Sequence, residues 1–375
     1  TEETMAKTKK KKNTSMINLN GRRNIIEKSK PILGIDIGSS TLKIIKMNKN
    51  HTLGKWVLET IPTGMINQGR IEAIEPLAEI IGKALKTYGI RIKNCALYVS
   101  GSEVIVRELL LPEMSDSQLK DNVKQEIESM LPLEHGEYCI DYKVLEYIKN
   151  EDSGDIGQVR VLAAAVPKEM VDDYILTMKR VGLKVSYIDV LPNIAGKLCK
   201  YIERNKSRIQ RNICMIDFGA KKTEIIIMRD GNYYLHKMIS YGGEYLTSSI
   251  ASKSGMDLID AEEYKCRTNF FQGDENDPIN RQVFDYFDFL LRDFERTMEF
   301  YSNRNHQKVD RIYLMGGGAL LEGLAKFMEE QLSIEVRLIS DVFEEYQRVG
   351  AIGRHISVFS QAIGTTFREE WKYEG

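Results

Sequence analysis

The sequence predicts an α/β protein built from two related lobes that face each other. Residues 32–46 contain an apolar run interrupted only by one aspartate, then a Gly-Ser-Ser step, then a second apolar run. Residues 213–228 repeat this pattern without a gap, and residues 311–320 add another apolar stretch that ends in glycines. The two copies are too far apart in sequence for a solenoid repeat, so the duplication indicates two domains.

The first copy is predicted to be a β-hairpin that binds phosphate. Its apolar runs fit two buried strands, and the step between them fits a tight turn. Small residues at Gly38, Ser39 and Ser40 let backbone N–H groups approach an anion, and the two hydroxyls add donors. Asp36, at the end of the first strand, is placed to face a cation held by those phosphates, most simply Mg²⁺ through water. Aspartate and glycine beside a strand are also ordinary turn residues, so one hairpin alone is weak evidence.

The second copy makes the hypothesis of a shared ligand more specific. Asp217 and Gly219 correspond to Asp36 and Gly38, so each lobe offers one carboxylate and one glycine turn to a ligand between them. A duplication that serves structure alone is the alternative. Packing, however, does not require an aspartate at both turns.

The order of these motifs resembles the actin-like ATPase superfamily. The matching motifs are Asp-Ile-Gly-Ser-Ser from Asp36, Asp-Phe-Gly-Ala from Asp217, the pair Gly242 and Gly243, and Gly-Gly-Gly-Ala from Gly316. Between them, the sequence from about Pro31 to Arg368 resembles the PilM family of type IV pilus assembly proteins, which are relatives of the division protein FtsA. The resemblance implies an actin-like ATPase fold, with two related lobes around a nucleotide cleft and an inserted small α+β subdomain.

The resemblance also implies that ATP or ADP binds with Mg²⁺ between the lobes, with Asp36 and Asp217 as the metal ligands. The three glycines from Gly316 would lie close to adenine. The complete nucleotide site implied in this way consists of Asp36, Gly38, Ser39, Ser40, Thr41, Lys43, Asp217, Gly219, Ala220, Lys221, Gly242, Gly243, Glu262, Lys265, Gly316, Gly317 and Gly318.

Two parts of this site have a plain structural alternative. Gly242 and Gly243 precede a helix that could aim N–H donors at phosphate, but glycines that only pack or cap a helix would look the same. Glu262 and Lys265 match positions that bracket ribose and adenine in the family. An i,i+3 ion pair on a helix surface has the same spacing.

Residues 103–183 change to a pattern of strand, helix, two strands and helix, which predicts a compact α+β insertion. In the PilM and FtsA families the comparable insertion helps to contact partners. The predicted division of the chain is 1–30 as a basic tail, 31–102 with 184–208 as the first lobe (1A), 103–183 as the insertion (1C), 209–246 with 307–368 as the second lobe (2A), 247–306 as a helical subdomain (2B), and 369–375 as a tail.

The basic tail contains a candidate partner peptide. Residues 16–23 have apolar side chains at alternate positions, and Ile17, Asn18 and Leu19 resemble the Ile-Asn-Leu motif of PilN, the membrane partner in the PilM family. We expect this PilN-like peptide, fused by nature or by design, to occupy a groove between the insertion and the first lobe in cis. A tail with two chance apolar residues is the alternative.

Composition narrows the class of protein. With 375 residues and 42% hydrophobic content the chain can bury a large core, and its net charge of −1 gives no overall field for nucleic acid. The first thirty residues hold nine Lys or Arg against three Glu, so any attraction to anionic lipid lies in the tail. The five cysteines include no CxxC pair, the histidines lack metal-ligand spacing, and no apolar run is long enough to span a membrane. Together with the resemblance, this predicts a cytoplasmic protein that reaches the inner face of the membrane through a partner.

Several functions fit these features. The favoured one is an ATP-binding adaptor of the type IV pilus machinery, which binds the cytoplasmic peptide of PilN and links it to other inner-membrane and motor components. An FtsA-like, filament-forming ATPase and a phosphotransferase like the sugar kinases are the alternatives. Residues 184–208, where hydrolytic actins present a glutamine to the attacking water, contain no glutamine, and Asn193 is the candidate substitute. We expect slow ATP hydrolysis or none.

Overall fold

The computed structural model describes residues 31–48, 52–131, 136–149, 156–204, 212–274, 276–346 and 350–367. Within them, two five-stranded sheets share one topology, with the orders β10-β6-β1-β2-β3 and β13-β12-β11-β14-β15. In each sheet the central strand pairs antiparallel with the next strand of a meander on one side and parallel with one later strand on the other, and a further strand pairs parallel with that later strand. The predicted α/β fold with two related lobes is therefore confirmed. The strands are β1(Ile32–Ile37), β2(Thr41–Met47), β3(Leu53–Thr60), β6(Asn94–Tyr98), β10(Lys184–Asp189), β11(Asn212–Phe218), β12(Thr223–Arg229), β13(Asn232–Ile239), β14(Arg311–Met315) and β15(Val336–Leu338).

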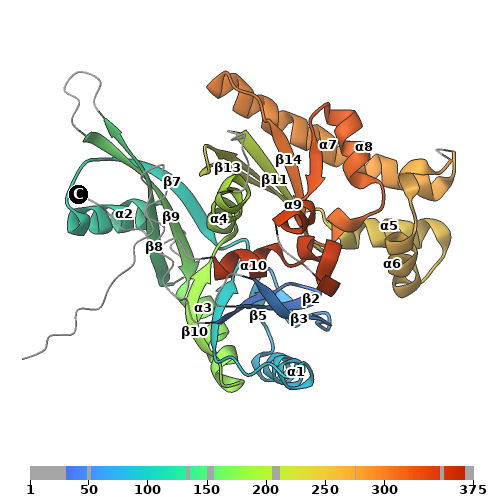
Figure 1. Ribbon diagram of the computed structural model, residues 1–375, viewed down its shortest axis with the longest axis horizontal. Helices are drawn as coiled ribbons and strands as arrows, with labels where there is room; N and C mark the ends of the chain where they lie inside the picture. The colour runs from blue at the N-terminus through green and yellow to red at the C-terminus, as the bar shows by residue number, and fades with distance from the viewer. Residues whose placement is uncertain are drawn as a thin grey trace, which may run out of the picture.

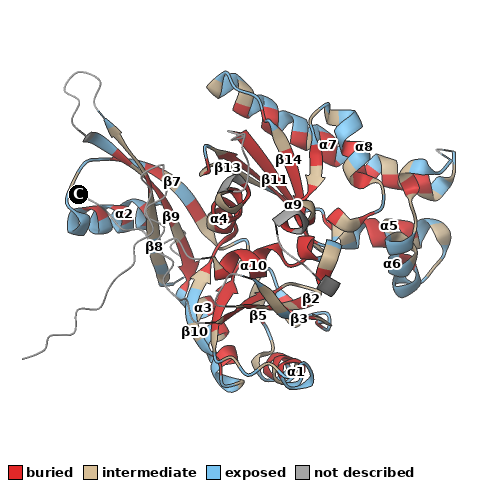
Figure 2. Ribbon diagram, viewed as in Figure 1, coloured by how far each residue is buried: buried red, intermediate tan, exposed pale blue. Residues whose placement is uncertain are grey.

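The two sheets lie on either side of a shared layer of helices (Figure 1). This layer contains α4(Leu191–Arg204) and α10(Ser360–Thr366), and every residue of α10 is buried (Figure 2). The core between the sheets draws on both of them, with Ile45 and Tyr98 from the first and Met215 and Met315 from the second. Close packing of one common core therefore joins the lobes.

Different helices cover the outer faces of the two sheets. The first sheet packs against α1(Ile74–Thr87) and α3(Lys168–Arg180), and the second packs against α5(Gly243–Ser254) and α7(Pro278–Asn305). Asp277 caps α7 by accepting the N–H groups of Ile279 and Asn280. The aromatic stripe of this helix is predicted to be core, and the buried side chains of Phe294 and Tyr301 confirm that interpretation.

The inserted segment forms a separate three-stranded sheet of order β7-β9-β8, which lies beside the first sheet in Figure 1. Its strands are β7(Ile105–Pro112), β8(Tyr138–Lys149) and β9(Ile156–Pro167), and α2(Asp116–Met130) covers one face. The predicted capping box starts this helix, because the N–H of Ser115 donates to Gln118 Oε1 at 3.1 Å. The boundaries proposed for the lobes and the insertion remain predictions.

One segment differs from the expectation. The apolar pattern of residues 320–332 predicts a single helix, whereas the chain makes a 3₁₀ turn, then a bend at Gly323 with φ of 81°, and only then a helix. A left-handed residue interrupts α-helical propagation, so the helix starts after the glycine. The remaining elements are β4(Ile66–Asn67), β5(Arg70–Ile71), α6(Leu258–Arg267), η2(Phe270–Gln272), η3(Gly318–Leu320), α8(Leu324–Leu332), α9(Ile339–Tyr346) and η4(Gly350–Ser357).

None of the helices in the described ranges is both long enough and apolar enough to cross a bilayer.

We predict that Gly34→Ala destabilises the protein by roughly 2–3 kcal/mol, because a Cβ at Gly34 would lie 1.8 Å from the carbonyl oxygen of Ala362 in α10. Gly82→Ala is the control. Its Cβ meets nothing closer than 3.6 Å, so helix propensity should stabilise this variant by about 0.5–1 kcal/mol. Urea unfolding of the two variants measures both effects, and equal stability would contradict the role assigned to α10.

Candidate functional site

Two matching hairpins place one buried carboxylate each at the ends of the central strands. Asp36 and Asp217 are the penultimate residues of β1 and β11, and they are 4% and 7% exposed. The turns have the same hydrogen bond, since the N–H of Gly38 donates to the carbonyl of Thr41 at 2.9 Å and that of Gly219 donates to Lys222 at 2.9 Å. The duplicated sequence thus folds into duplicated turns.

The two hairpins differ in the residue opposite the aspartate. Asp36 pairs in register with Lys43, and the Lys43 Nζ lies 3.0 Å from Asp36 Oδ2. Asp217 pairs in register with Glu224, a second carboxylate. Asp36 therefore has a cation of the protein beside it. Asp217 has none within ion-pair distance among the residues that the structure describes.

Charges from both hairpins act on Asp217, so the two turns lie near each other. Burial, as the largest cause, and the charges of Glu224 and Asp36 raise the pKa of Asp217 to about 7, against the opposing charges of Lys43 and Lys222. Residues from the first sheet thus influence a carboxyl of the second. A cation placed between the turns would offset this accumulation of negative charge.

Sequence reasoning missed three residues of this cluster. Lys222 lies 2.8 Å from Glu224 Oε2, and His236 Nε2 lies 3.0 Å from Glu224 Oε1. Burial opposes ionisation of Glu224, but Lys222 and His236 outweigh it and lower its pKa to about 2. The alignment of the two hairpins contained the signal, because it places Glu224 where the first copy has Lys43. Lys221, predicted for the site, is exposed next to Lys222.

Tyr98 is a fourth missed residue, and it lies between the two lobes. It is paired in register with Asp36 at the end of β6, and its side chain belongs to the core between the sheets. Burial raises its pKa well above the usual value, and Glu224, Asp217 and Asp36 add to this effect. The sequence could have indicated Tyr98 by its position, because it lies at the carboxyl end of a parallel strand, next to the strand that carries Asp36.

The predicted phosphate donors at the start of α5 have another role. The N–H of Gly243 donates to the carbonyl of Gly219 at 3.0 Å, and that of Glu244 donates to Ala220 at 2.8 Å. A Cβ at Gly242 would lie 2.4 Å from the carbonyl oxygen of Ala220. The expectation that this helix start aims N–H groups at phosphate is therefore corrected, because those groups hold the second turn instead. Whether Gly242 and Gly243 touch a nucleotide remains a prediction.

Glu262 and Lys265 form the ion pair named as the alternative, and they also contact the start of α5. The Lys265 Nζ lies 2.6 Å from Glu262 Oε2, 2.8 Å from Thr247 Oγ1 and 3.2 Å from the carbonyl oxygen of Gly243. Burial opposes the charge on Glu262, but Lys265 and the hydrogen bonds lower its pKa. The pair therefore lies beside the second turn, where a nucleoside contact remains a prediction.

The three glycines after β14 are not equivalent. Gly316 has φ of 83°, and a Cβ there would lie 2.4 Å from Asp217 Oδ1, so only glycine fits beside that carboxylate. Gly318 approaches Phe218 in the same way. Gly317 is exposed and has open space around it, so it is the glycine best placed to contact a ligand.

On the first turn, the hydroxyls of Ser39 and Ser40 have no hydrogen-bond partner in the described part of the chain, and both residues are half-buried. The carbonyl of Ser40 accepts the N–H of Ile61 at 2.9 Å. Two hydroxyl donors therefore remain for an anion at this turn.

Asn193, the candidate substitute for a catalytic glutamine, is engaged at both ends of its amide. Its Nδ2 donates to Asp189 Oδ1 at 2.9 Å, and its Oδ1 accepts from the Lys143 Nζ at 3.2 Å. Asp189 also forms a buried ion pair with Lys197. The side chain of Asn193 is therefore held in place by charged groups on both sides.

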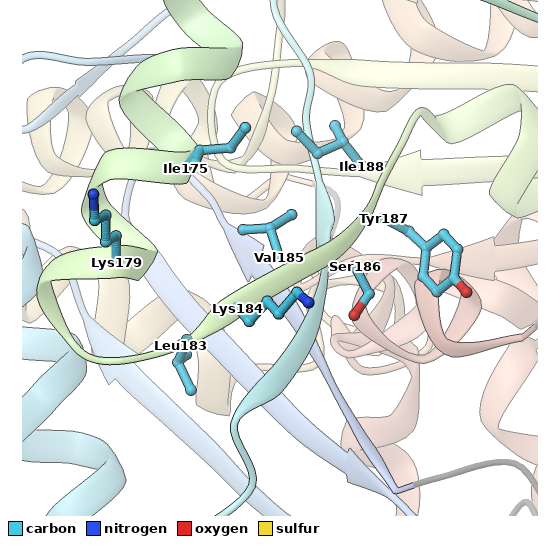
Figure 3. A pocket seen from close by; sticks show the side chains of 8 residues that line it. All are labelled: Ile175, Lys179, Leu183, Lys184, Val185, Ser186, Tyr187 and Ile188. Carbon is cyan, nitrogen blue, oxygen red and sulfur yellow. The ribbon is translucent and has the colours of Figure 1, made fainter.

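A cavity lies away from the two turns, between α3 and β10 (Figure 3). Its volume is about 450 Å³ and it is open to solvent. It is lined by Ile175, Lys179, Leu183, Lys184, Val185, Ser186, Tyr187 and Ile188. By the predicted boundaries this groove lies between the insertion and the first lobe, and its use as the peptide site stays a prediction. The peptide residues Ile17, Asn18 and Leu19 lie outside the described residues.

We predict that Asp217→Asn stabilises the ligand-free protein at high pH. Between about pH 4, where an unfolded Asp titrates, and about pH 7, the folded state binds more protons than the unfolded state, so ionisation of Asp217 lowers stability as pH rises. The gain in unfolding free energy should be near zero at pH 4 and about 1–3 kcal/mol at pH 8. Asp230→Asn, on an exposed turn, is the control. A gain that does not change with pH would contradict the burial argument.

Comparison with known proteins places this geometry in a family. The model of the type IV pilus assembly protein PilM family matches residues 34–369. Cell division protein FtsA of Escherichia coli strain K12 is 23% identical over 368 residues, which covers 82% of this chain and 84% of the relative. FtsA of Streptococcus pneumoniae serotype 2 strain D39 is 21% identical over 353 residues, covering 81% and 74%.

Solved structures show the same fold. A chain of a PilM-PilN type IV pilus biogenesis complex has a TM-score of 0.73 at 23% identity, covering 90% of this chain and 98% of that one. The ethanolamine utilization protein EutJ from Carboxydothermus hydrogenoformans has a TM-score of 0.55 at 13% identity, covering 89% and 88%. MreB 5 of Spiroplasma citri bound to AMPPNP has a TM-score of 0.51 at 12% identity, covering 89% and 94%. Since the family model spans most of the chain, this protein belongs to the PilM family of type IV pilus assembly proteins and has the actin-like ATPase fold.

Proposed function

We propose that this protein is a nucleotide-loaded adaptor of the type IV pilus machinery, which holds ATP or ADP with Mg²⁺ between its lobes and a PilN-like peptide in the groove beside β10. The proposal of nucleotide binding rests on the pair of buried carboxylates in the duplicated turns. The proposal of peptide binding rests on the groove between the insertion and the first lobe. PilM in the solved complex assembles with PilN, and MreB 5 binds AMPPNP, which supports both halves.

The residues at the two turns fit a metal-bound nucleotide. Asp36 and Asp217 would hold Mg²⁺, which neutralises phosphate charge when bound. The hydroxyls of Ser39 and Ser40 would donate to phosphate, and Lys43 would exchange its ion pair with Asp36 for phosphate oxygens. The excess of carboxylates that raises the pKa of Asp217 to about 7 is a physical reason for a cation to bind there.

The groove fits an extended peptide with apolar side chains at alternate positions. β10 pairs with β6 on one side, and no described strand pairs with its other edge. An open edge supplies backbone donors and acceptors, and neighbouring apolar side chains supply pockets. Ile175 and Tyr187, at 41% and 47% exposure, line this groove and would be covered by such a peptide.

The start of the described chain lies close enough for the tail peptide to bind in cis. Leu33, Cys95 and Val185 are in register across three neighbouring strands, so β1 begins about 10 Å from the groove strand at ordinary strand spacing. The twelve residues between Leu19 and Ile32 span at most roughly 40 Å when extended. Chain length therefore permits residues 16–23 to occupy the groove of their own molecule.

An adaptor accounts for the site better than a fast enzyme does. The amide of Asn193, the candidate substitute for a catalytic glutamine, already bonds Asp189 and Lys143. A kinase would also need a base beside a pocket for its second substrate.

We predict that Asp36→Ala and Asp217→Ala each reduce the nucleotide retained by purified protein at least tenfold in the presence of Mg²⁺, because each removes a carboxylate from the metal. Mass analysis of released nucleotide measures this, with Asp230→Ala as the control and circular dichroism as the check on folding. Unchanged nucleotide content in both variants would refute the assigned roles. Phosphate release near one per second would contradict the adaptor and favour an enzyme.

We predict that Ile175→Asp weakens binding of a peptide with the sequence of residues 16–23 about tenfold, because a charge replaces an apolar wall of the groove. Leu110→Asp is the matched control, since Leu110 is 53% exposed on the insertion but does not line the groove. Titration calorimetry gives both affinities, and equal losses in the two variants would place the peptide elsewhere.

Removal of residues 1–30 tests occupation in cis. If the tail occupies the groove, added peptide binds more tightly to the shortened chain because a tethered competitor is gone. Equal affinity for the full and shortened chains would reject occupation in cis while leaving binding in trans intact.

A further inference from the structure

We propose that Arg70 is a positioning residue for the groove, and that the segment from Ile61 to Ile71 links the first turn to the groove wall α3. This inference rests on the proposed peptide-binding function and assigns a means of regulating it. Arg70 does not line the groove, so its effect would pass through the helix that it holds.

The two walls of the groove are held in different ways. β10 is fixed by parallel pairing with β6, which belongs to the central sheet. α3, whose Ile175 and Lys179 form the other wall, is outside any sheet and depends on side-chain contacts for its position. The width of the groove therefore depends on what holds α3.

The hairpin formed by the short strands β4 and β5 holds the first half of α3. In β5, the Arg70 Nε and Nη2 donate at 2.6 Å to the two oxygens of Glu103, where the insertion begins, and Nη1 donates at 3.0 Å to Glu169 in the first turn of α3. The hydroxyl of Tyr174 donates to the carbonyl of Gly69 at 3.0 Å. Tyr174 is 1% exposed and precedes the groove residue Ile175, so this contact fixes the wall directly.

The geometry of Arg70 distinguishes it from an ordinary surface ion pair. Exposed pairs contribute little to stability, but a fork that bonds both oxygens of a carboxylate is directional. The hydrogen bonds to Glu103 and Glu169 raise the pKa of Arg70 above its usual value, so all its donors remain protonated. One side chain thus joins the first lobe, the entry to the insertion and α3.

The same segment begins at the first turn. The N–H of Ile61 donates to the carbonyl of Ser40 at 2.9 Å, and the N–H of Glu72 donates to Met65 at 2.8 Å, which closes the segment into a compact unit. Ile66 and Ile71 anchor this unit in the core of the first sheet. If the first turn shifts when phosphate binds, it would therefore move the packed segment from Ile61 to Ile71, whose other end is hydrogen-bonded to α3.

The test compares full-length wild type, Arg70→Ala and Arg180→Ala, with and without Mg²⁺-ATP. Arg180 lies on α3 itself, and its pair with Glu75 is exposed at 3.5 Å, so it controls for loss of an exposed arginine contact to that helix. We expect Arg70→Ala to weaken the affinity for the peptide of residues 16–23 about tenfold and to remove its dependence on nucleotide, with Arg180→Ala within about twofold of wild type. Glu169→Ala removes only the contact between Arg70 and α3 and should also weaken the peptide affinity, whereas loss of this largely exposed carboxylate has little effect on stability.

Equal effects of Arg70→Ala and Arg180→Ala, or no effect of either, would overturn the proposal. If wild type binds no peptide at all, the docking function fails, and hydrogen exchange of residues 168–189 then decides the link separately. Faster exchange in Arg70→Ala than in wild type and Arg180→Ala would support the positioning role. Equal exchange in all three proteins would overturn it.

Discussion

Two carboxylates from different sheets lie in one buried region, and the protein compensates them unequally. Asp36 has Lys43 at 3.0 Å, whereas Asp217 faces Glu224 and has its pKa raised to about 7. Like charges at low exposure are costly because the interior screens them poorly. The fold maintains this arrangement because both aspartates are the penultimate residues of central strands that are buried on both faces. A site with this excess of negative charge is suited to bind a cation, and the proposed function depends on that binding.

The core between the sheets brings the two carboxylates together. Tyr98 and Ile45 from one sheet and Met215 and Met315 from the other fill one space with α4 and α10. The hydroxyl groups of α10 are satisfied locally, since Ser360 and Thr365 both donate to carbonyls three residues back. A helix near the end of the sequence can therefore be buried at the centre of the molecule without orphaned hydroxyl groups.

The groove lies at the opposite side of the first sheet from the meander. The order β10-β6-β1-β2-β3 makes β10 an edge strand, and the insertion places α3 beside that edge. Edge strands are sites where another chain can add a strand, so a protein must cover the edge or use it. The proposed peptide binding would use this edge. The contacts of Arg70 would then let the first turn influence how the edge is presented.

Local sequence patterns were sufficient for the two hairpins, the capping box at Ser115, the long helix α7 and the duplication of the lobes. Each depends on residues close together in sequence, such as alternating apolar positions or a cap three residues from its partner. The partners of Glu224, the buried place of Tyr98 and the role of the Gly243 N–H could not be obtained in this way. They depend on which carbonyl or charge a distant strand brings near.

The sequence by itself determined that the chain duplicates a strand–turn–strand unit with an aspartate at each turn, because that information is local and periodic. The tertiary structure alone decided that these turns lie near each other, that Asp217 has no counterpart of the Lys43 ion pair among the described residues, and that the N–H of Gly243 bonds the second turn. It also decided that a groove lies between α3 and β10. These features arise from packing between segments far apart in the chain. Burial and the geometry of the neighbouring backbone decide which partner a group bonds, whereas the local sequence pattern does not distinguish between the possible partners.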